Sequence, residues 1–192
     1  MTGRTHDLGA FTALFLMALN VVLPQMSVTT FVLALVANQM GAIAPDLDEP
    51  TAHLWRSHPL GGVVGKVVDR MLGGHRFLSH SLLGVFLFGV GFHYLLAFFQ
   101  PSVRSMDVTL IWRSFMIGIV SHLLLDTLTK EGVPWFLPLP LKIGFPPLKA
   151  LRITTGELVE KGLIFPGLLL LNFYLLWSHY ETIRQFFHLN IH

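Results

Sequence analysis

Residues 108–126 read VTLIWRSFMIGIVSHLLLD, an apolar run with one charged residue, Arg113, before it ends on His122 and Asp126. A run of this length without strand alternation is typical of a helix that crosses a membrane, which needs about 17–25 residues. Its last turn carries an imidazole and a carboxylate at the point where the helix leaves the hydrocarbon. The sequence therefore predicts a membrane helix that ends in a polar site.

Further apolar runs occur at residues 8–23, 28–44, 82–99 and 163–177. Hydrophobic residues make up 53% of the 192-residue chain and charged residues 12%, and the mean hydropathy is +0.62. This composition excludes an ordinary soluble domain. The absence of cysteine excludes disulfides and thiolate metal sites. We expect an all-α fold, a polytopic membrane bundle of four to five transmembrane helices forming one domain over residues 1–192.

The basic residues predict the orientation of the bundle. Five spans place ten lysines and arginines on the side of the two long loops, and two, Arg104 and Arg184, on the other. By the positive-inside rule the first side faces the cytoplasm, which indicates a bacterial or archaeal inner membrane. Orientation alone accounts for these charges, although they could also hold anionic head groups or a phosphate. The ten are Arg4, Arg56, Lys66, Arg70, Arg76, Lys130, Lys142, Lys149, Arg152 and Lys161.

Residues that commonly bind metals gather on that same side, at the ends of the apolar runs. Nine of the eleven acidic residues fall there, with Asp107 and Glu181 as the exceptions. The larger loops explain part of this bias, but they do not explain His122 and Asp126, which close a span. The group comprises His6, Asp46, Asp48, His75, His80, His122, Asp126, Glu157 and Glu160.

His122 and Asp126 are four residues apart, so a helix presents both on one face. Ionisable groups near a span are expensive, by about 2.5–3.5 kcal/mol at its centre, and tend to mark function. A metal ion coordinated by both would offset much of this cost. The alternative is an aspartate that orients a packed histidine at the membrane boundary.

Residues 41–48 read GAIAPDLD. Pro45 ends the helix, so Asp46 and Asp48 are expected on a short extended segment with both carboxylates pointing the same way. They could bridge two cations, or one could bind a cation while the other orients a ligand histidine. In isolation the same pattern is typical of a turn or a helix cap.

Residues 73–81 read GGHRFLSHS. His75 and His80 could reach one centre if the first lies on the loop and the second at the following helix, which Ser79 or Ser81 is expected to cap. Arg76 would then lie beside the metals, where its guanidinium could hold phosphate oxygens. The alternative role for Arg76 is to anchor the protein at the membrane interface. Residues 133–140, VPWFLPLP, form either a similar interfacial anchor or a lid that admits a lipid.

Taken in order, these motifs resemble the YdjM-like family of inner-membrane metal-dependent hydrolases. That family is distantly similar to zinc-dependent phospholipases C and single-strand nucleases, whose helical sites hold two or three metals. The resemblance implies metal roles for His6, Asp46 or Asp48, His75 or His80, His122 and Asp126. It rests on His6, Pro45-Asp46-Leu47-Asp48, His75-Arg76, His80-Ser81, Ser121-His122, Asp126, Thr129, Gly132-Val133-Pro134, Gly156 and Glu160.

On this basis we expect a membrane-bound hydrolase of lipid or other amphiphilic phosphoesters. Two divalent ions about 3.5–4 Å apart would activate water and stabilise the attacking and leaving oxygens. Zinc suits the donors, while manganese or magnesium stays open. In this interpretation Asp48 is a ligand or general base and Arg76 binds phosphate. His75 and Glu160 contact either the ions or their ligands, and the ions are held by His6, Asp46, His80, His122 and Asp126.

The competing class is a non-enzymatic metal-binding scaffold or a metal transporter with the same ligands. A transporter would favour charged groups through several span midplanes, where this chain has only Asn38, Gln39, His93 and Arg113. Nucleic-acid binding is not expected at a net charge of +2. The sequence leaves the substrate, the number of ions and the oligomeric state open.

Overall fold

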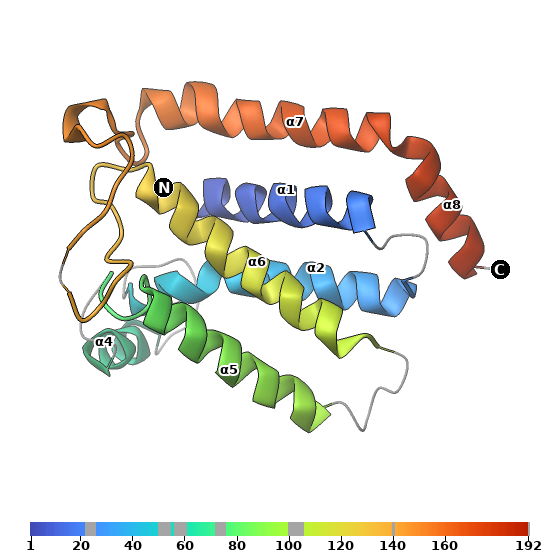
Figure 1. Ribbon diagram of the computed structural model, residues 1–192, viewed down its shortest axis with the longest axis horizontal. Helices are drawn as coiled ribbons and strands as arrows, with labels where there is room; N and C mark the ends of the chain where they lie inside the picture. Colours follow the sequence, from blue (N-terminus) through green and yellow to red (C-terminus); the bar gives the residue numbers. More distant parts are fainter. Residues whose placement is uncertain are drawn as a thin grey trace.

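The computed structural model describes residues 1–21, 26–49, 55, 61–71, 76–99, 106–139 and 141–191 (Figure 1). These residues contain helices and two isolated β-bridges but no strand, so the prediction of an all-α fold is confirmed. The longer helices are α1 (Gly3–Val21), α2 (Val28–Ile43), α5 (Leu82–Phe99), α6 (Val108–Thr127) and α7 (Phe165–Ser178). The shorter elements are η2 (Ala44–Asp48), α4 (Gly61–Met71), η4 (Lys149–Leu151), η5 (Glu160–Ile164) and α8 (Tyr180–Ile191).

Four helical segments are long and apolar enough to cross a membrane: Val28–Asp48, Leu82–Phe99, Val108–Thr127 and Glu160–Ser178. The windows in α2 and α6 are each 44% buried, whereas those in α5 and α7 are 22% and 11% buried. Because α5 and α7 expose most of their apolar surface, their outer faces suit contact with lipid. Helix α1 is not among the four, since its first two turns carry charged residues, but it packs between α2, α6 and α7.

Helices α2 and α6 meet at their backbones. A Cβ atom on Gly41 would collide with the carbonyl of Phe115, and one on Gly118 would collide with the carbonyl of Asn38. The side chain of Asn38 is fully buried and donates a hydrogen bond to the Ser114 carbonyl at 3.1 Å. Small residues at such contacts allow close helix approach in membranes, where apolar surface alone gives little association.

Replacing Gly118 by leucine is therefore expected to destabilise the bundle by about 1–3 kcal/mol or more, as overpacking does in other cores. Thermal unfolding in detergent, followed by circular dichroism, measures this change. Gly91→Leu is the matched control, because a Cβ on Gly91 of α5 meets nothing within 4 Å. Equal unfolding temperatures for the two variants would contradict the close contact.

The start of α1, the end of α2, the start of α5, the end of α6 and the start of α7 lie at one end of the bundle, at the left of Figure 1. We call this the polar end. The arrangement agrees with the topology count from the sequence. Ser81 caps α5 as expected, since its Oγ accepts a hydrogen bond from the Gly84 amide at 3.1 Å.

The loop that follows α6 is tied to the polar end. The Trp135 indole donates to Thr127 Oγ1 at 3.0 Å, and the Trp135 carbonyl accepts from the Leu82 amide at 3.0 Å. Beyond this anchor the loop exposes large apolar side chains, among them Phe136 at 56% and Phe145 at 62%. The loop therefore has a fixed base and an apolar outer surface, which suits the membrane boundary.

Candidate metal centre

Five of the predicted site residues come together at the polar end. His6 comes from α1, Asp46 from η2, His80 from the turn before α5, and His122 and Asp126 from α6. Four of these side chains are almost completely buried, while the Asp46 side chain is 29% exposed. Segments distant in sequence thus bring imidazoles and carboxylates into one buried cluster, with Asp46 at its opening.

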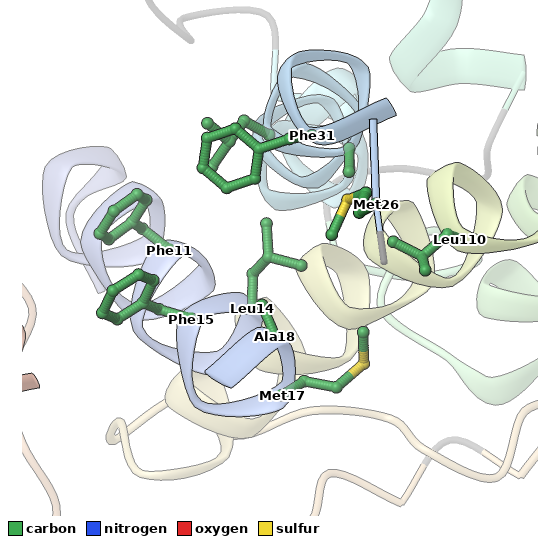
Figure 2. Close-up of a pocket in the computed structure, with 10 residues that line it drawn as sticks. Phe11, Leu14, Phe15, Met17, Ala18, Met26, Phe31 and Leu110 are labelled. Carbon is green, nitrogen blue, oxygen red and sulfur yellow. The ribbon is translucent and has the colours of Figure 1, made fainter. Parts of the chain in front are cut away.

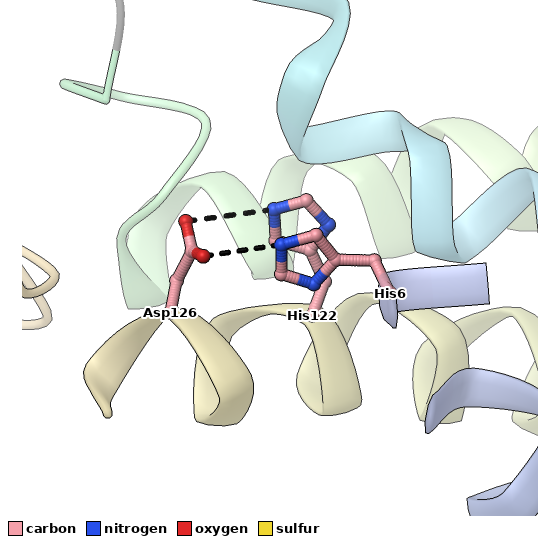
Figure 3. Close-up of side chains that lie close together, drawn as sticks. All are labelled: His6, His122 and Asp126. Carbon is pink, nitrogen blue, oxygen red and sulfur yellow. Dashed lines mark ion pairs between the residues drawn. The ribbon is translucent and has the colours of Figure 1, made fainter. Parts of the chain in front are cut away.

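The first group consists of His6, His122 and Asp126 (Figure 3). His6 Nε2 lies 3.1 Å from Asp126 Oδ1, and His122 Nε2 lies 3.9 Å from Asp126 Oδ2. The two imidazole rings stack with centroids 3.7 Å apart and planes 8° from parallel. One ligand atom from each residue can be chosen so that all three lie within 4.8 Å of one another, which is suitable for a shared ion.

The second group consists of Asp46, His80 and His122. Asp46 Oδ1 lies 3.5 Å from His122 Nε2 and 3.7 Å from His80 Nε2. Asp126 Oδ2 lies 3.7 Å from His80 Nε2 as well. The two groups therefore share His122, and the two oxygens of Asp126 point to different groups.

Contacts of the His122 ring suit it to metal binding. Its Nδ1 lies 2.6 Å from the Ala42 carbonyl oxygen, which can only accept, so Nδ1 carries the proton. The lone pair then resides on Nε2, which is buried and has no hydrogen-bond partner among the described residues. A ligand histidine commonly has this arrangement, with one nitrogen donating to a carbonyl and the other left for the metal.

Asp48 lies behind the cluster. Its Oδ2 accepts hydrogen bonds from the Arg76 amide at 3.0 Å and from Ser79 Oγ. Ser79 Oγ also lies 2.9 Å from His80 Nδ1. These contacts favour a role for Asp48 in orienting His80, rather than the ligand or general-base role expected from the sequence. The expectation of an extended segment is wrong, because residues 44–48 form a 3-10 helix with Pro45 near its start.

Arg76 lies beside the cluster, as expected. It has a positive φ of 59°, and its side chain is 9% exposed. Its Nη2 lies 2.7 Å from Asp126 Oδ2, and its Nη1 lies 3.2 Å from the exposed carboxylate of Glu131. Asp126 also contacts the α-amino group of Met1. A guanidinium so close to the ligand atoms can meet a phosphate bound there.

Glu160 does not contact the cluster. Its Oε1 accepts hydrogen bonds from the Thr2 amide and hydroxyl at 2.7 Å each and from the Thr5 hydroxyl at 2.6 Å. Its Oε2 accepts from the Gly156 amide at 2.7 Å. Glu160 thus fastens the start of α1 to the segment before α7 and positions His6, the residue after Thr5. His75 lies outside the described residues.

Replacing Glu160 by glutamine is expected to leave buried donors unpaired, each costing about 1–3 kcal/mol, and to weaken metal binding by roughly 10–100-fold through misplacement of His6. Thermal unfolding and metal titration measure the two effects. Glu157→Gln is the control, because Glu157 is exposed. If Glu160→Gln left both stability and metal binding unchanged, this positioning role would be contradicted.

Sequence reasoning missed the roles of Thr5, Ser79 and Asp7. A signal for the first two exists, because His6, His80 and His122 each follow a serine or threonine, and two of these hydroxyls hold carboxylates near the site. Asp7 lies at the edge of the cluster. Burial raises the pKa of its carboxyl, and nearby Asp46 adds to this rise while His6 opposes it.

The chain matches the family described as YdjM inner membrane protein over residues 1–184. It is 30% identical over 174 residues to the uncharacterized protein YvsG of Bacillus subtilis (strain 168), and the match covers 91% of this chain and 93% of that relative. No solved structure shows significant similarity. Together with four apolar helices of spanning length, the match over most of the chain shows that this protein belongs to the YdjM inner membrane protein family.

Proposed function

We propose that this protein is a membrane-bound, metal-dependent hydrolase that cleaves a phosphoester of a lipid or another amphiphile at the cytoplasmic face. The observation that carries the proposal is the buried convergence of His6, His80, His122 and Asp126 with the partly exposed Asp46. Burying so many ionisable groups is costly unless they serve a ligand or a reaction.

The donor set fits a divalent ion. Imidazole nitrogens and carboxylate oxygens without sulfur suit zinc and also permit manganese, with magnesium less favoured by imidazole. His122 offers only Nε2, so it serves one ion. Asp126 has Oδ1 near His6 and Oδ2 near His80 and Arg76, so it would help to hold the metal in either group. Two divalent ions, when bound, would supply water activation and stabilise charge on the phosphate oxygens.

Specific side chains would bind the phosphate and orient the ligands. Arg76 would hold a non-bridging phosphate oxygen, since its guanidinium already lies at the ligand atoms. Asp46 is the ligand candidate that a substrate can reach from outside. Asp48 and Ser79 would keep the His80 ring oriented. In the overall reaction one water is consumed, the ester P–O bond breaks, and the departing alcohol takes up a proton.

Ion transport is less well supported than hydrolysis. Helices α2 and α6 are in direct backbone contact at Gly41 and Gly118, which leaves no space between them there. The buried Asn38 side chain donates its hydrogen bond to a backbone carbonyl. A continuous polar path through the bundle would need side chains lining that interface. A metal-binding scaffold would use the same ligands. Only a measurement of substrate turnover distinguishes it from an enzyme.

Removing the metal is expected to abolish hydrolysis, and adding zinc or manganese back is expected to restore it. The assay uses the detergent-purified chain with phosphatidic acid, phosphatidylglycerol, an isoprenyl phosphate and bis(p-nitrophenyl) phosphate as substrates. Chelator-treated protein refilled with magnesium serves as a metal-specificity control. Metal binding without release of product from any of these substrates would support the scaffold and contradict the hydrolase.

A further inference from the structure

Two hollows lie beside the metal centre, between the start of α1 and the start of α7. One is a shallow, widely open depression of about 380 Å³ that also contacts α2 through Gln39. The other has a volume of about 460 Å³ and includes Thr2 and Lys161. Arg4 and Phe165 line both hollows. The hollows are therefore adjacent and form one groove with cationic side chains at its polar end.

The residues of α1 that line this groove follow one helix face. Arg4, Asp7, Leu8 and Phe11 line the hollow next to α2, with the spacing of three and four residues that defines a single face. Along the same face, Leu14 and Phe15 line a narrow apolar crevice that shares Phe11 with the groove (Figure 2). Leu14 and Phe15 are themselves buried, at 5% and 6% exposure, so the accessible part of this face runs from Arg4 to Phe11.

Helix α2 supplies the opposite wall in the same order. Phe31 and Leu35 line the apolar crevice, and Gln39 lines the hollow. The crevice itself holds only about 10 Å³ and its Leu14 and Phe15 side chains are buried, so it offers no room for an acyl chain. From Arg4 to Phe11 the helical rise is about 10 Å, which keeps the accessible part of the face within one leaflet of the ~30 Å hydrocarbon core.

The groove lies beside the metal centre. Asp46 lies in η2, which directly follows α2, the helix that carries Gln39. Asp46 is also the partly exposed member of the cluster. Asp7, which lines the groove, directly follows His6 of the cluster, and the Gln39 side chain donates a hydrogen bond to the Asp7 carbonyl at 3.3 Å. A molecule in the groove would therefore lie next to the cluster.

We propose that this groove binds an anionic phospholipid of the same leaflet and that substrate reaches Asp46 sideways from the bilayer through it. The phosphate lies near Arg4 and Lys161, and one acyl chain lies over Leu8, Phe11 and Phe165. Charge complementarity supports this occupant, because both cations are exposed at the mouth, whereas the nearby Glu160 carboxylate is buried and engaged. The substrate route rests on the proposed hydrolase, but lipid binding does not.

The test is native mass spectrometry of the full chain with dioleoylphosphatidylglycerol against dioleoylphosphatidylethanolamine. Wild type is expected to retain one phosphatidylglycerol preferentially. Arg4→Gln combined with Lys161→Gln is expected to weaken retention at least about fivefold, as loss of a cation near an anionic surface does. Lys142→Gln with Lys149→Gln is the matched control, since both lysines are exposed and lie between α6 and η5.

A second variant, Leu8→Trp, fills the groove without a change in charge and is expected to remove the bound lipid. Leu124→Trp is its control, because Leu124 is 55% exposed on α6. Equal retention by wild type, Leu8→Trp and the Arg4/Lys161 variant would overturn the lipid site. A change of oligomeric state in Leu8→Trp with lipid retained would assign the groove to a second copy and would also overturn it.

Two further measurements distinguish failure of this proposal from failure of the proposed function. They are metal content and cleavage of the soluble ester bis(p-nitrophenyl) phosphate. If the groove is correct, Leu8→Trp keeps its metal and its cleavage of the soluble ester but loses cleavage of phosphatidylglycerol. Full cleavage of the lipid by Leu8→Trp would contradict the route alone. If wild type retains lipid, the variants lose it, and wild type cleaves neither ester, the lipid site would be supported and both the hydrolase and the substrate route would be rejected.

Discussion

Replacing His122 by alanine is expected to lower kcat/KM for phosphoester cleavage by at least roughly 10³-fold, because loss of one stabilising donor alone costs about 10²–10³ and loss of an ion removes more. His122 is common to both groups of ligand candidates. Its removal therefore damages each of them. The measurement is steady-state hydrolysis by the detergent-purified variant together with its metal content.

His93→Ala is the matched control for this substitution. His93 is an exposed histidine of a neighbouring membrane helix, α5, and its ring contacts Tyr94 rather than the cluster. We expect this variant to keep wild-type metal content and activity. Full activity in His122→Ala would show that the cluster is not the reaction centre.

Replacing Arg76 by lysine is expected to lower kcat/KM by about 10²–10³-fold while the metal is retained. Lysine keeps the positive charge, but it cannot reproduce the planar fork that reaches both Asp126 and Glu131. It also keeps a side chain at the positive φ of this position, so backbone strain is unchanged. Hydrolysis and metal content are measured on the same preparation.

Arg70→Lys provides the control, because Arg70 is an exposed arginine at the last turn of α4. It tests whether any exchange of arginine for lysine lowers activity, or whether the effect is specific to Arg76. If Arg76→Lys lost its metal together with its activity, Arg76 would be a structural partner of Asp126 rather than a phosphate ligand. If it lost neither, the guanidinium would have no part in the reaction.

The topology could be predicted because long apolar runs have few alternatives in a membrane. The topology count from the sequence requires five helix termini to lie at one end of the bundle. The structure places them there: the ends of α2 and α6 and the starts of α1, α5 and α7. The shorter helices α4 and α8 could not be recognised in the same way, since each mixes polar and apolar residues over only 11 or 12 positions. Helix α1 begins at Gly3, before its apolar run, because Glu160 holds its first turn.

The membership of the cluster could be predicted better than the role of each residue. His122 and Asp126 are placed by helical periodicity, whereas Asp46 and Asp48 diverge because a 3-10 helix replaces the extended segment. The topology count and the resemblance both place Glu160 near the site, but its contacts come from Thr2 and Thr5, almost the whole chain away. Such long-range hydrogen bonds have no signature in local spacing.

The central claim is that the buried cluster binds a divalent ion, and elemental analysis of the detergent-purified chain tests it most directly. We predict at least one tightly bound zinc or manganese ion per chain in wild type. We also predict its loss in Asp126→Asn, which keeps the size of the side chain and removes the charge. Wild-type protein that holds no ion, even after incubation with zinc or manganese, would contradict the claim and make the cluster a structural element of the membrane bundle.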